Sequence, residues 1–273
     1  MAKDDYQKTL ERHLADYKER RLGVREKGTF GHRGVERQYR HILPKPLQWL
    51  NVPEPFRREV HEYVAEHRHI KLHKYFHHLN SSQAFALALF VPYLTKAPAA
   101  LVRAIGFTSP KEWGLERVPD EKEGTNVDVW ARSSDGAETY CEVKLSEREF
   151  GPAVDDMRHR SKLDSIYGPV LSGQIDDVLL EPKAFFANYQ ILRNLWLAAR
   201  AGHERDRAVF LFPKANAGIG DQLDAVLAQV AAPLCQRVAV VHVEPLLESL
   251  AADTTPAGLG WYARLLQEKY VPV

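Results

Sequence analysis

The stretch NVDVWARSSDGAETYCEVKLSE, residues 126–147, decides the fold that we expect for this chain. It holds two runs rich in strand-forming residues, separated by the turn signal Ser-Ser-Asp-Gly at residues 133–136. The segment is therefore predicted to form a β-hairpin. Because successive side chains of a strand point to opposite faces, Glu142 and Lys144 share one face.

The length of the hairpin loop decides whether Asp128 joins that face. A two-residue loop would pair Asp128 with Val143 and turn it away from Glu142. A three-residue loop, residues 134–136, pairs Asp128 with Glu142 directly. We expect the three-residue loop, a type I turn with Gly136 in the left-handed region, because it brings two carboxylates and a lysine together.

The predicted cluster of Asp128, Glu142 and Lys144 has the composition of a metal-dependent catalytic site. Two carboxylates on adjacent strands can hold a hard divalent cation, and a nearby lysine can orient water and offset charge on a phosphate. An acidic residue, a hairpin and then Glu-x-Lys resembles the motif of the PD-(D/E)XK nuclease superfamily. Val127 stands where that motif often has proline. The resemblance covers roughly residues 80–243.

The resemblance implies both a fold and an activity. The core would be restriction-endonuclease-like. The order of the expected elements by itself predicts an α/β fold, with a mixed central sheet flanked by helices, and residues before the core form an N-terminal helical extension. The activity would be metal-dependent phosphodiester hydrolysis, with DNA as the expected substrate. Mg²⁺ or Mn²⁺ would be held by Asp128, Glu142 and the Val143 carbonyl, while Lys144 positions or activates water. Restriction, defence and repair are all typical settings, and the sequence selects none of them.

Two other functions stay open at this stage. One is a nucleic-acid-binding module on the same fold that has no catalysis. The other is a structural or regulatory protein whose hairpin charges form a solvated ion pair. The intact set of Asp128, Glu142 and Lys144 favours the nuclease over the binding module.

Two more residues are candidates for the catalytic site. Glu116 lies on an expected strand over residues 113–118, where it is either a third carboxylate or a surface residue. Gln190 lies on an expected helix over residues 184–200. Several superfamily branches carry a glutamine on the helix after the Glu-x-Lys strand. The alternative is that Gln190 satisfies nearby backbone groups.

Ser82 and Gln83 precede a nearly continuous apolar run over residues 84–94, which predicts a buried helix. Their segment also resembles a block found in one bacterial branch of the superfamily. That resemblance would place Ser82 and Gln83 beside metal-bound water or DNA. The other interpretation is that they only begin the helix.

The charge of the chain is unevenly distributed. Residues 1–78 hold 17 Lys and Arg against 11 Asp and Glu, a net +6, which leaves −5 for the rest of the chain. A basic N-terminal part suits a grip on nucleic acid, although an ordinary charged helical face would look the same. Residues 23–40 are glycine-rich and are expected to form a loop. The residues expected to contact phosphates are Arg25, Lys27, Arg33, Arg37, Arg158 and Arg160.

Histidines recur every four residues near the end of a helix expected over residues 55–78, at His69, His73 and His77. A zinc site would need further ligands. With no cysteine or closely spaced glutamate at hand, we expect instead a solvated, phosphate-contacting or partly buried face.

Two regions are expected: a basic helical region over residues 1–78 and a PD-(D/E)XK-like core over residues 79–273. Two cysteines cannot make a disulfide framework. The N-terminus lacks a signal-like apolar run, and the sequence has no membrane-spanning stretch. We therefore expect a soluble, cytoplasmic protein that binds nucleic acid and no membrane. Its oligomeric state is left open.

Overall fold

The computed structural model describes residues 3–32, 34–105, 109–255 and 257–272. The chain forms two compact units. The first comprises Met1–Phe107, Pro213–Ala215 and His242–Val273, and the second comprises Thr108–Phe212 and Asn216–Val241. The domain boundary expected after residue 78 stays a prediction.

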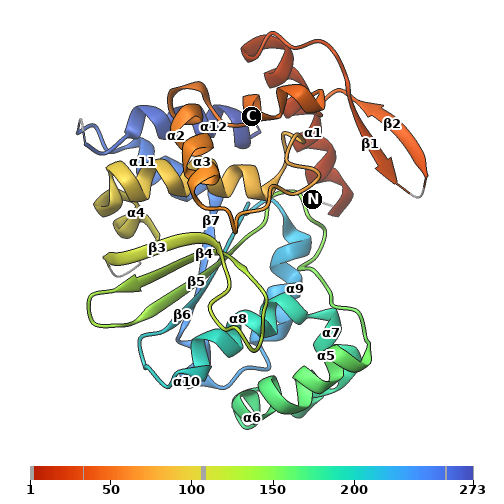
Figure 1. Ribbon diagram of the computed structural model, residues 1–273, viewed down its shortest axis with the longest axis vertical. Coiled ribbons are helices and arrows are strands. Elements are labelled where there is room, and N and C mark those ends of the chain that lie inside the picture. Colours follow the sequence, from red (N-terminus) through yellow and green to blue (C-terminus); the bar gives the residue numbers. More distant parts are fainter. Residues whose placement is uncertain (1–2, 33, 106–108, 256, 273) are drawn as a thin grey trace. The chain divides into compact units, whose positions relative to one another are not determined.

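The second unit is built on a five-stranded sheet with the order β3-β4-β5-β6-β7 (Figure 1). β3, β4 and β5 pair antiparallel, whereas β5 and β6 pair parallel, so the sheet is mixed. This confirms the predicted α/β class with a mixed sheet flanked by helices. The strands are β3 (Pro110–Arg117), β4 (Val127–Ser133), β5 (Glu138–Val143), β6 (Arg207–Phe212) and β7 (Val238–His242).

The β4–β5 hairpin has the register expected from its sequence. Arg132 pairs with Glu138, and the Ser133 amide donates to the Ala137 carbonyl at 2.9 Å, so residues 134–136 form a three-residue loop. Gly136 has a φ of 90°, which glycine adopts without the Cβ clash that other residues meet. Loop chemistry therefore fixes which side chains share a face of the sheet.

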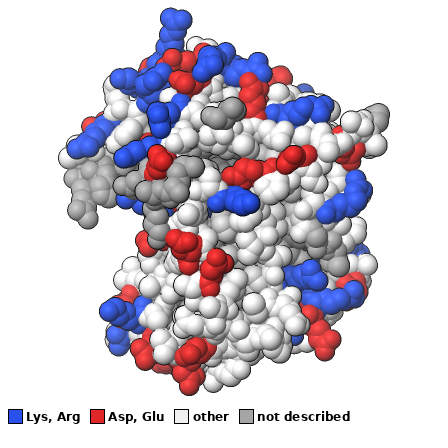
Figure 2. Space-filling model, turned by 180° about the vertical axis from the view of Figure 1, so that it is seen from behind, with Lys and Arg blue, Asp and Glu red and all other residues white. Residues whose placement is uncertain are grey.

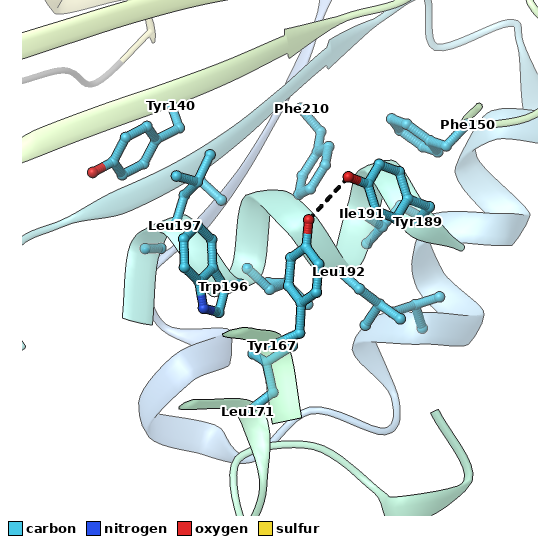
Figure 3. Close-up of a cluster of buried hydrophobic side chains, with 14 of the residues drawn as sticks. Tyr140, Phe150, Tyr167, Leu171, Tyr189, Ile191, Leu192, Trp196, Leu197 and Phe210 are labelled. Atoms are coloured by element: carbon cyan, nitrogen blue, oxygen red, sulfur yellow. Dashed lines mark hydrogen bonds between the residues drawn. The ribbon is translucent and has the colours of Figure 1, made fainter. Parts of the chain in front are cut away.

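Helix α8 (Tyr189–Arg200) packs on β5 and β6. The core between them joins Tyr140 and Phe210 of the sheet to the apolar face of α8, including Leu192 and Trp196 (Figure 3). Burying each such side chain contributes roughly 1.5–3 kcal/mol. The other helices of this unit are α5 (Met157–Lys162), a π turn (Leu163–Tyr167), α6 (Gly168–Leu171), a 3₁₀ turn (Asp177–Leu180), α7 (Pro182–Ala187), α9 (Ala217–Leu227) and α10 (Ala232–Cys235).

The helix expected over residues 184–200 is two helices in the structure, α7 and α8. They meet at Asn188, whose φ of −114° and ψ of 23° lie outside the helical region. The Asn188 amide still donates to the Ala184 carbonyl at 3.2 Å, so the break leaves that group satisfied. The break lets α8 begin at Tyr189, next to Gln190.

The first unit is mostly helical. α3 is buried from Ala84 to Leu94, as its apolar run predicts, and the Ser81 hydroxyl caps it by accepting the Ala84 amide at 3.3 Å. No helix in the described part of the chain is long and apolar enough to cross a membrane. The elements are α1 (Lys3–Arg21), β1 (Gly28–His32), β2 (Val35–Tyr39), a 3₁₀ helix (Lys45–Asn51), α2 (Glu54–Glu66), α3 (Ser82–Lys96), α4 (Pro98–Ile105), α11 (Val243–Ala251) and α12 (Gly260–Tyr270).

Two local expectations for the first unit are wrong. Residues 23–40 are not a loop throughout, because β1 and β2 pair as an antiparallel hairpin over much of that range. The helix expected over residues 55–78 ends at Glu66, so the histidine repeat does not follow a helical face. The segment after α2 is held by Gln83, whose side chain accepts the His73 amide at 2.7 Å and donates to the Lys71 carbonyl at 3.0 Å.

Candidate active site

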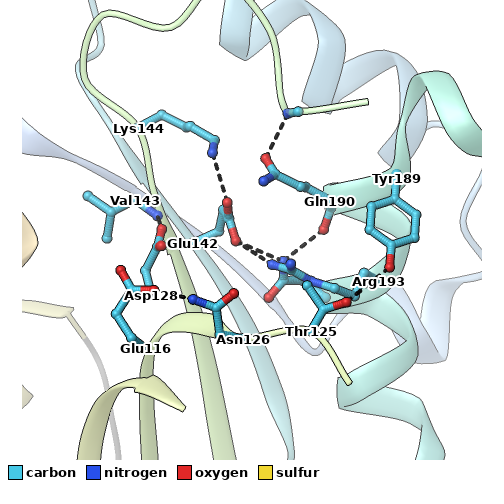
Figure 4. A network of polar contacts seen from close by, with 12 residues as sticks. Glu116, Thr125, Asn126, Asp128, Glu142, Val143, Lys144, Tyr189, Gln190 and Arg193 are labelled. Atoms are coloured by element: carbon cyan, nitrogen blue, oxygen red, sulfur yellow. Dashed lines mark hydrogen bonds and ion pairs between the residues drawn. The ribbon is translucent and has the colours of Figure 1, made fainter. Parts of the chain in front are cut away.

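Three carboxylates lie in a row across β3, β4 and β5 (Figure 4). The pairing on both sides of Glu116 places it opposite Asp128, and the β4–β5 register places Asp128 opposite Glu142. Lys144 follows Glu142 by two residues and donates from Nζ to Glu142 Oε1 at 2.8 Å. The structure thus brings together the residues that the sequence motif singled out.

Glu116 has a left-handed backbone, with a φ of 53°. For a residue with a Cβ this conformation costs roughly 1–2 kcal/mol, and such strain is concentrated at functional sites. Its carboxylate accepts a hydrogen bond from the side-chain Nδ2 of Asn126, and its charge contributes to raising the pKa of Asp128. Glu116 therefore faces the same row as Asp128, as expected of a third carboxylate.

Glu142 is almost fully buried, and cationic or amide groups approach both of its oxygens. Oε1 accepts from Lys144, while Oε2 accepts from Arg193 at 2.6 Å and from Asn194 at 3.3 Å. Burial alone would raise the pKa of Glu142, but the charges of Lys144 and Arg193 bring it below its ordinary value. Glu142 is thus an ionised carboxylate held between two cations.

Asp128 responds to the same surroundings in the opposite direction. Its Oδ2 accepts the Val143 amide at 2.7 Å. Burial and the charge of Glu142 raise the pKa of Asp128 well above its ordinary value, and Lys144 only partly offsets them. The pKa of Lys144 is raised, because Glu142 and Asp128 outweigh the effect of burial. Asp128 is the carboxyl of the pair that takes up a proton more readily.

Arg193 and Asn194 are site residues that the sequence motif did not reveal. Both are buried on α8, at 3% and 0% exposure. Arg193 Nε and Asn194 Oδ1 are buried with no hydrogen-bond partner among the described residues. The local signal is weak, because polar residues among apolar ones on α8 also include Gln190 and Arg200. Their pairing with Glu142, some fifty positions earlier, depends on how α8 packs on the sheet.

Gln190 lies beside this row and supports the chain that follows β5. Its Oε1 accepts the Gly151 amide at 2.7 Å. A Cβ added at Gly151 would come within 2.9 Å of Gln190 Cδ, so glycine permits this close approach. Gln190 thus does satisfy nearby backbone, and its catalytic role stays a prediction.

A buried acid behind the row fixes the segment that enters β4. Glu123 is 1% exposed and accepts hydrogen bonds from Tyr167 at 2.6 Å, Tyr189 at 2.8 Å and Thr125 at 2.6 Å. Burial would raise the pKa of Glu123, but these hydrogen bonds together bring it below its ordinary value. The network joins Tyr189 of α8 to the strand that carries Asp128.

The predicted nucleic-acid contacts are spread over both units. Arg25, Lys27 and Arg37 are exposed in the first unit, and Arg33 lies outside the described residues. Arg158 and Arg160 are exposed in the second unit, where Arg160 forms an ion pair with Asp155 at 2.6 Å. Ser82 is the first residue of α3 and Gln83 binds backbone groups, so contacts of either residue with metal-bound water or DNA stay predictions.

Asp128 and Glu142 fit a hard divalent cation in their chemistry. Both present oxygen donors on one face of the sheet, and a cation would relieve the repulsion that raises the pKa of Asp128. No group of three or more His, Cys, Asp or Glu within the described ranges is arranged to hold a metal. Two carboxylates are nevertheless a usual protein contribution to Mg²⁺, which keeps several waters and binds substrate phosphates.

The mixed sheet, with its acidic row and the lysine beside it, defines an α/β protein of the restriction-endonuclease-like class. The family model described as "Restriction Endonuclease associating with ARP" matches residues 11–271, and the chain belongs to this family. Membership indicates a nuclease-like role. Comparison with curated proteins and with solved structures gave no match.

Proposed function

We propose that this protein is a metal-dependent nuclease of the PD-(D/E)XK type that hydrolyses phosphodiester bonds in DNA. The observation that carries the proposal is the β4–β5 register, which sets Asp128 opposite Glu142. Lys144 Nζ donates a hydrogen bond to Glu142 Oε1 at 2.8 Å. The proposal is also supported by membership in a restriction endonuclease family, whose model matches residues 11–271.

The cation in this proposal is Mg²⁺ or Mn²⁺, held by Asp128, Glu142 and the Val143 carbonyl. When bound, the ion supplies Lewis-acid polarisation of the scissile phosphate. Glu116 extends the acidic row by one strand and is the next carboxylate available to the site. Gln190 holds the loop that follows Lys144 and so helps to shape the site.

Lys144 is the residue that serves the reacting groups. In hydrolysis, a water oxygen bonds to phosphorus and the bond from phosphorus to the leaving sugar oxygen breaks. The proton that the water gives up passes to solvent, and the leaving oxygen takes up a proton and becomes a hydroxyl. The Lys144 ammonium orients the water and offsets charge that develops on the phosphate oxygens. To do so it exchanges its contact with Glu142 for one with the substrate.

Arg193 keeps Glu142 ionised when Lys144 moves from Glu142 to the substrate. It donates to Oε2, whereas Lys144 binds Oε1, so Glu142 keeps one cationic partner when Lys144 turns to the substrate. A buried carboxylate without any partner would take up a proton and lose its affinity for a cation. Arg193 therefore acts on the reaction through the position and charge of Glu142.

A second candidate is a nucleic-acid-binding module without catalysis. This function is favoured because both carboxylate oxygens of Glu142 already have cationic partners, Lys144 and Arg193. In that case the cations hold the carboxylate as a structural group, and no divalent ion replaces them.

Cleavage assays on supercoiled, linear and single-stranded DNA and on RNA separate the two functions. The nuclease requires activity with Mg²⁺, none in excess EDTA, and loss of at least a hundredfold in Asp128→Asn. Glu149→Gln removes one exposed carboxylate of similar size near the site and should leave the rate unchanged. Nucleic-acid binding without cleavage under every condition would establish the binding module instead, and full activity in EDTA would refute the metal.

A further inference from the structure

The β1–β2 hairpin is a two-stranded ribbon that extends from the first unit (Figure 1). Its register runs from Gly28 opposite Tyr39 at the base to His32 opposite Val35 near the tip. β2 is exposed from Val35 to Gln38. Side chains on both faces of β2 are therefore in contact with solvent.

The base of the ribbon is firmly attached to its unit. The Gly28 amide donates to the Ile42 carbonyl at 2.9 Å, and a Cβ at Gly28 would meet the Leu43 carbonyl oxygen at 2.3 Å. Phe30 packs edge-on against Tyr75 and His78, with ring centroids 5.1 and 5.5 Å apart. The half of the ribbon beyond Phe30 therefore extends from a base that is held in place.

An isolated two-stranded ribbon is only marginally stable in water. The exposed outer half buries little apolar surface, so intramolecular packing gives it little stability. Val35, at 55% exposure, adds little to that packing. A partner that fits around a narrow ribbon would supply the missing contacts.

The side chains of β2 match the chemistry of base edges. Val35 and Arg37 share one face, and Gln38 lies on the other. In the major groove arginine binds guanine through two hydrogen bonds, glutamine does so with adenine, and an apolar group contacts the thymine methyl. Val35 and Arg37 therefore offer two of these contacts from one exposed face, whereas Gln38 points away from it.

Charge complementarity favours the same partner. Residues 25–40 hold five Lys and Arg against two Asp and Glu, a net +3. Figure 2 shows Lys and Arg gathered over the part of the first unit that holds α1 and the ribbon. Lys27 is exposed near the base, where phosphates flanking a groove would lie, while Arg40 beside it forms an ion pair with Glu19 at 2.9 Å.

We propose that the β1–β2 ribbon enters the major groove of duplex DNA and contacts base edges through Val35 and Arg37, which share one face of β2. Strands about 4.8 Å apart, each about 17 Å long, fit a groove about 12 Å wide. The major groove of duplex RNA is too narrow for such a ribbon. The inference rests on the proposed function in taking duplex DNA as the partner, but it requires no catalysis.

The test measures binding of the full chain by fluorescence anisotropy, in EDTA, to duplex DNA and to duplex RNA of the same sequence. Wild type should bind the DNA at least tenfold more tightly than the RNA. Val35→Ala combined with Arg37→Ala should weaken DNA binding at least tenfold. Arg58→Ala removes an exposed arginine of α2 and should change binding by less than twofold. Circular dichroism checks that each variant is folded.

A second variant separates base contacts from phosphate contacts. Arg37→Lys keeps the charge but loses the paired hydrogen bonds to guanine. It should reduce discrimination between DNA sequences while the dependence of affinity on salt stays the same. Methyl green, which occupies the major groove, should compete with the protein, and a minor-groove ligand should not.

Unchanged DNA binding in the double variant, or equal affinity for duplex DNA and RNA, would overturn the inference. A double variant that loses only self-association would also overturn it and would identify the ribbon as a contact between copies. The experiments distinguish failure of the proposed nuclease activity from failure of the proposed ribbon contact. Wild-type DNA cleavage with ribbon-independent binding refutes only the ribbon, whereas ribbon-dependent binding without cleavage refutes only the nuclease.

Discussion

The β4–β5 and β1–β2 hairpins are built alike and placed differently. β4 and β5 lie inside a five-stranded sheet and carry Asp128 and Glu142, whereas β1 and β2 form a ribbon with an exposed outer strand. The buried hairpin holds acids whose ionisation depends on their neighbours. The exposed one carries Arg37 and Gln38, whose side chains reach solvent directly. Burial therefore decides whether a hairpin's polar residues act on each other or on a partner.

The largest expected effect comes from breaking the register of the buried hairpin. Deleting Ser134 leaves a two-residue loop, so one strand slips by one residue and its side chains change face. Asp128 then leaves the row, and DNA cleavage with Mg²⁺ should fall to the level of Asp128→Ala. Gly136→Ala keeps the loop length and should cost only about 1 kcal/mol through its left-handed backbone.

Activity measured beside a urea unfolding curve separates loss of the site from loss of the fold. A deletion variant that is folded and inactive agrees with the register. Wild-type activity in that variant would show that the alignment of Asp128 with Glu142 is not needed.

The same comparison explains what the sequence could and could not reveal. The β4–β5 register follows from local signals, namely loop length, Gly136 and the alternation of side chains. Residues 23–40 carry four glycines, which conceal the alternation of β1 and β2 and resemble a loop. The pairing of β1 with β2 is supported by the contact between Phe30 and His78. Because these residues are far apart in the sequence, no local sequence pattern predicts that contact.

Contacts between distant segments were equally hidden. Arg193 reaches Glu142 only because α8 crosses the sheet, and the sequence motif ends at Lys144. The sequence leaves open whether Gln83 lies beside DNA or only begins a helix, and in the structure its side chain binds the backbone of residues 71 and 73. Side chains recruited to satisfy backbone groups cannot be told from catalytic ones by residue type alone.

A second prediction probes the charges inside the buried hairpin. Glu142→Gln leaves the buried Arg193 and Lys144 without their shared carboxylate, which should lower the free energy of unfolding by about 3–5 kcal/mol. Adding Arg193→Met removes one of these two uncompensated charges and should restore part of that stability. Urea unfolding of wild type, both single variants and the double variant gives the coupling energy.

The outcome distinguishes a true pair from two independent residues. If the effects of Glu142→Gln and Arg193→Met simply add, the two side chains do not stabilise each other. The double variant should remain inactive in either case, because it lacks one of the two carboxylates that hold the cation.

The last and smallest expected effect concerns the region that anchors the ribbon. Burial lowers the pKa of His41 to about 4, with Lys18 contributing, and lowers that of His78 to about 3, with His77, His41 and His73 contributing. Both histidines are therefore neutral in the folded protein, whereas in the unfolded chain they titrate near 6.5. The unfolded state binds more protons below that pH, so stability falls as pH falls.

This contribution is complete above about pH 6.5 and is lost as the pH drops toward 4. For His41 alone it amounts to roughly 2–3 kcal/mol. Because His78 packs against Phe30, an opening that lets His78 take up a proton becomes easier as the pH falls. The base of the ribbon should therefore open before the sheet of the second unit responds. Hydrogen exchange at pH 7 and pH 5 should show faster exchange, after correction for intrinsic rates, at Gly28–His32 than at β5. His41→Gln, which cannot ionise, should reduce the pH dependence of unfolding, and an unchanged dependence would show that His41 is not its source.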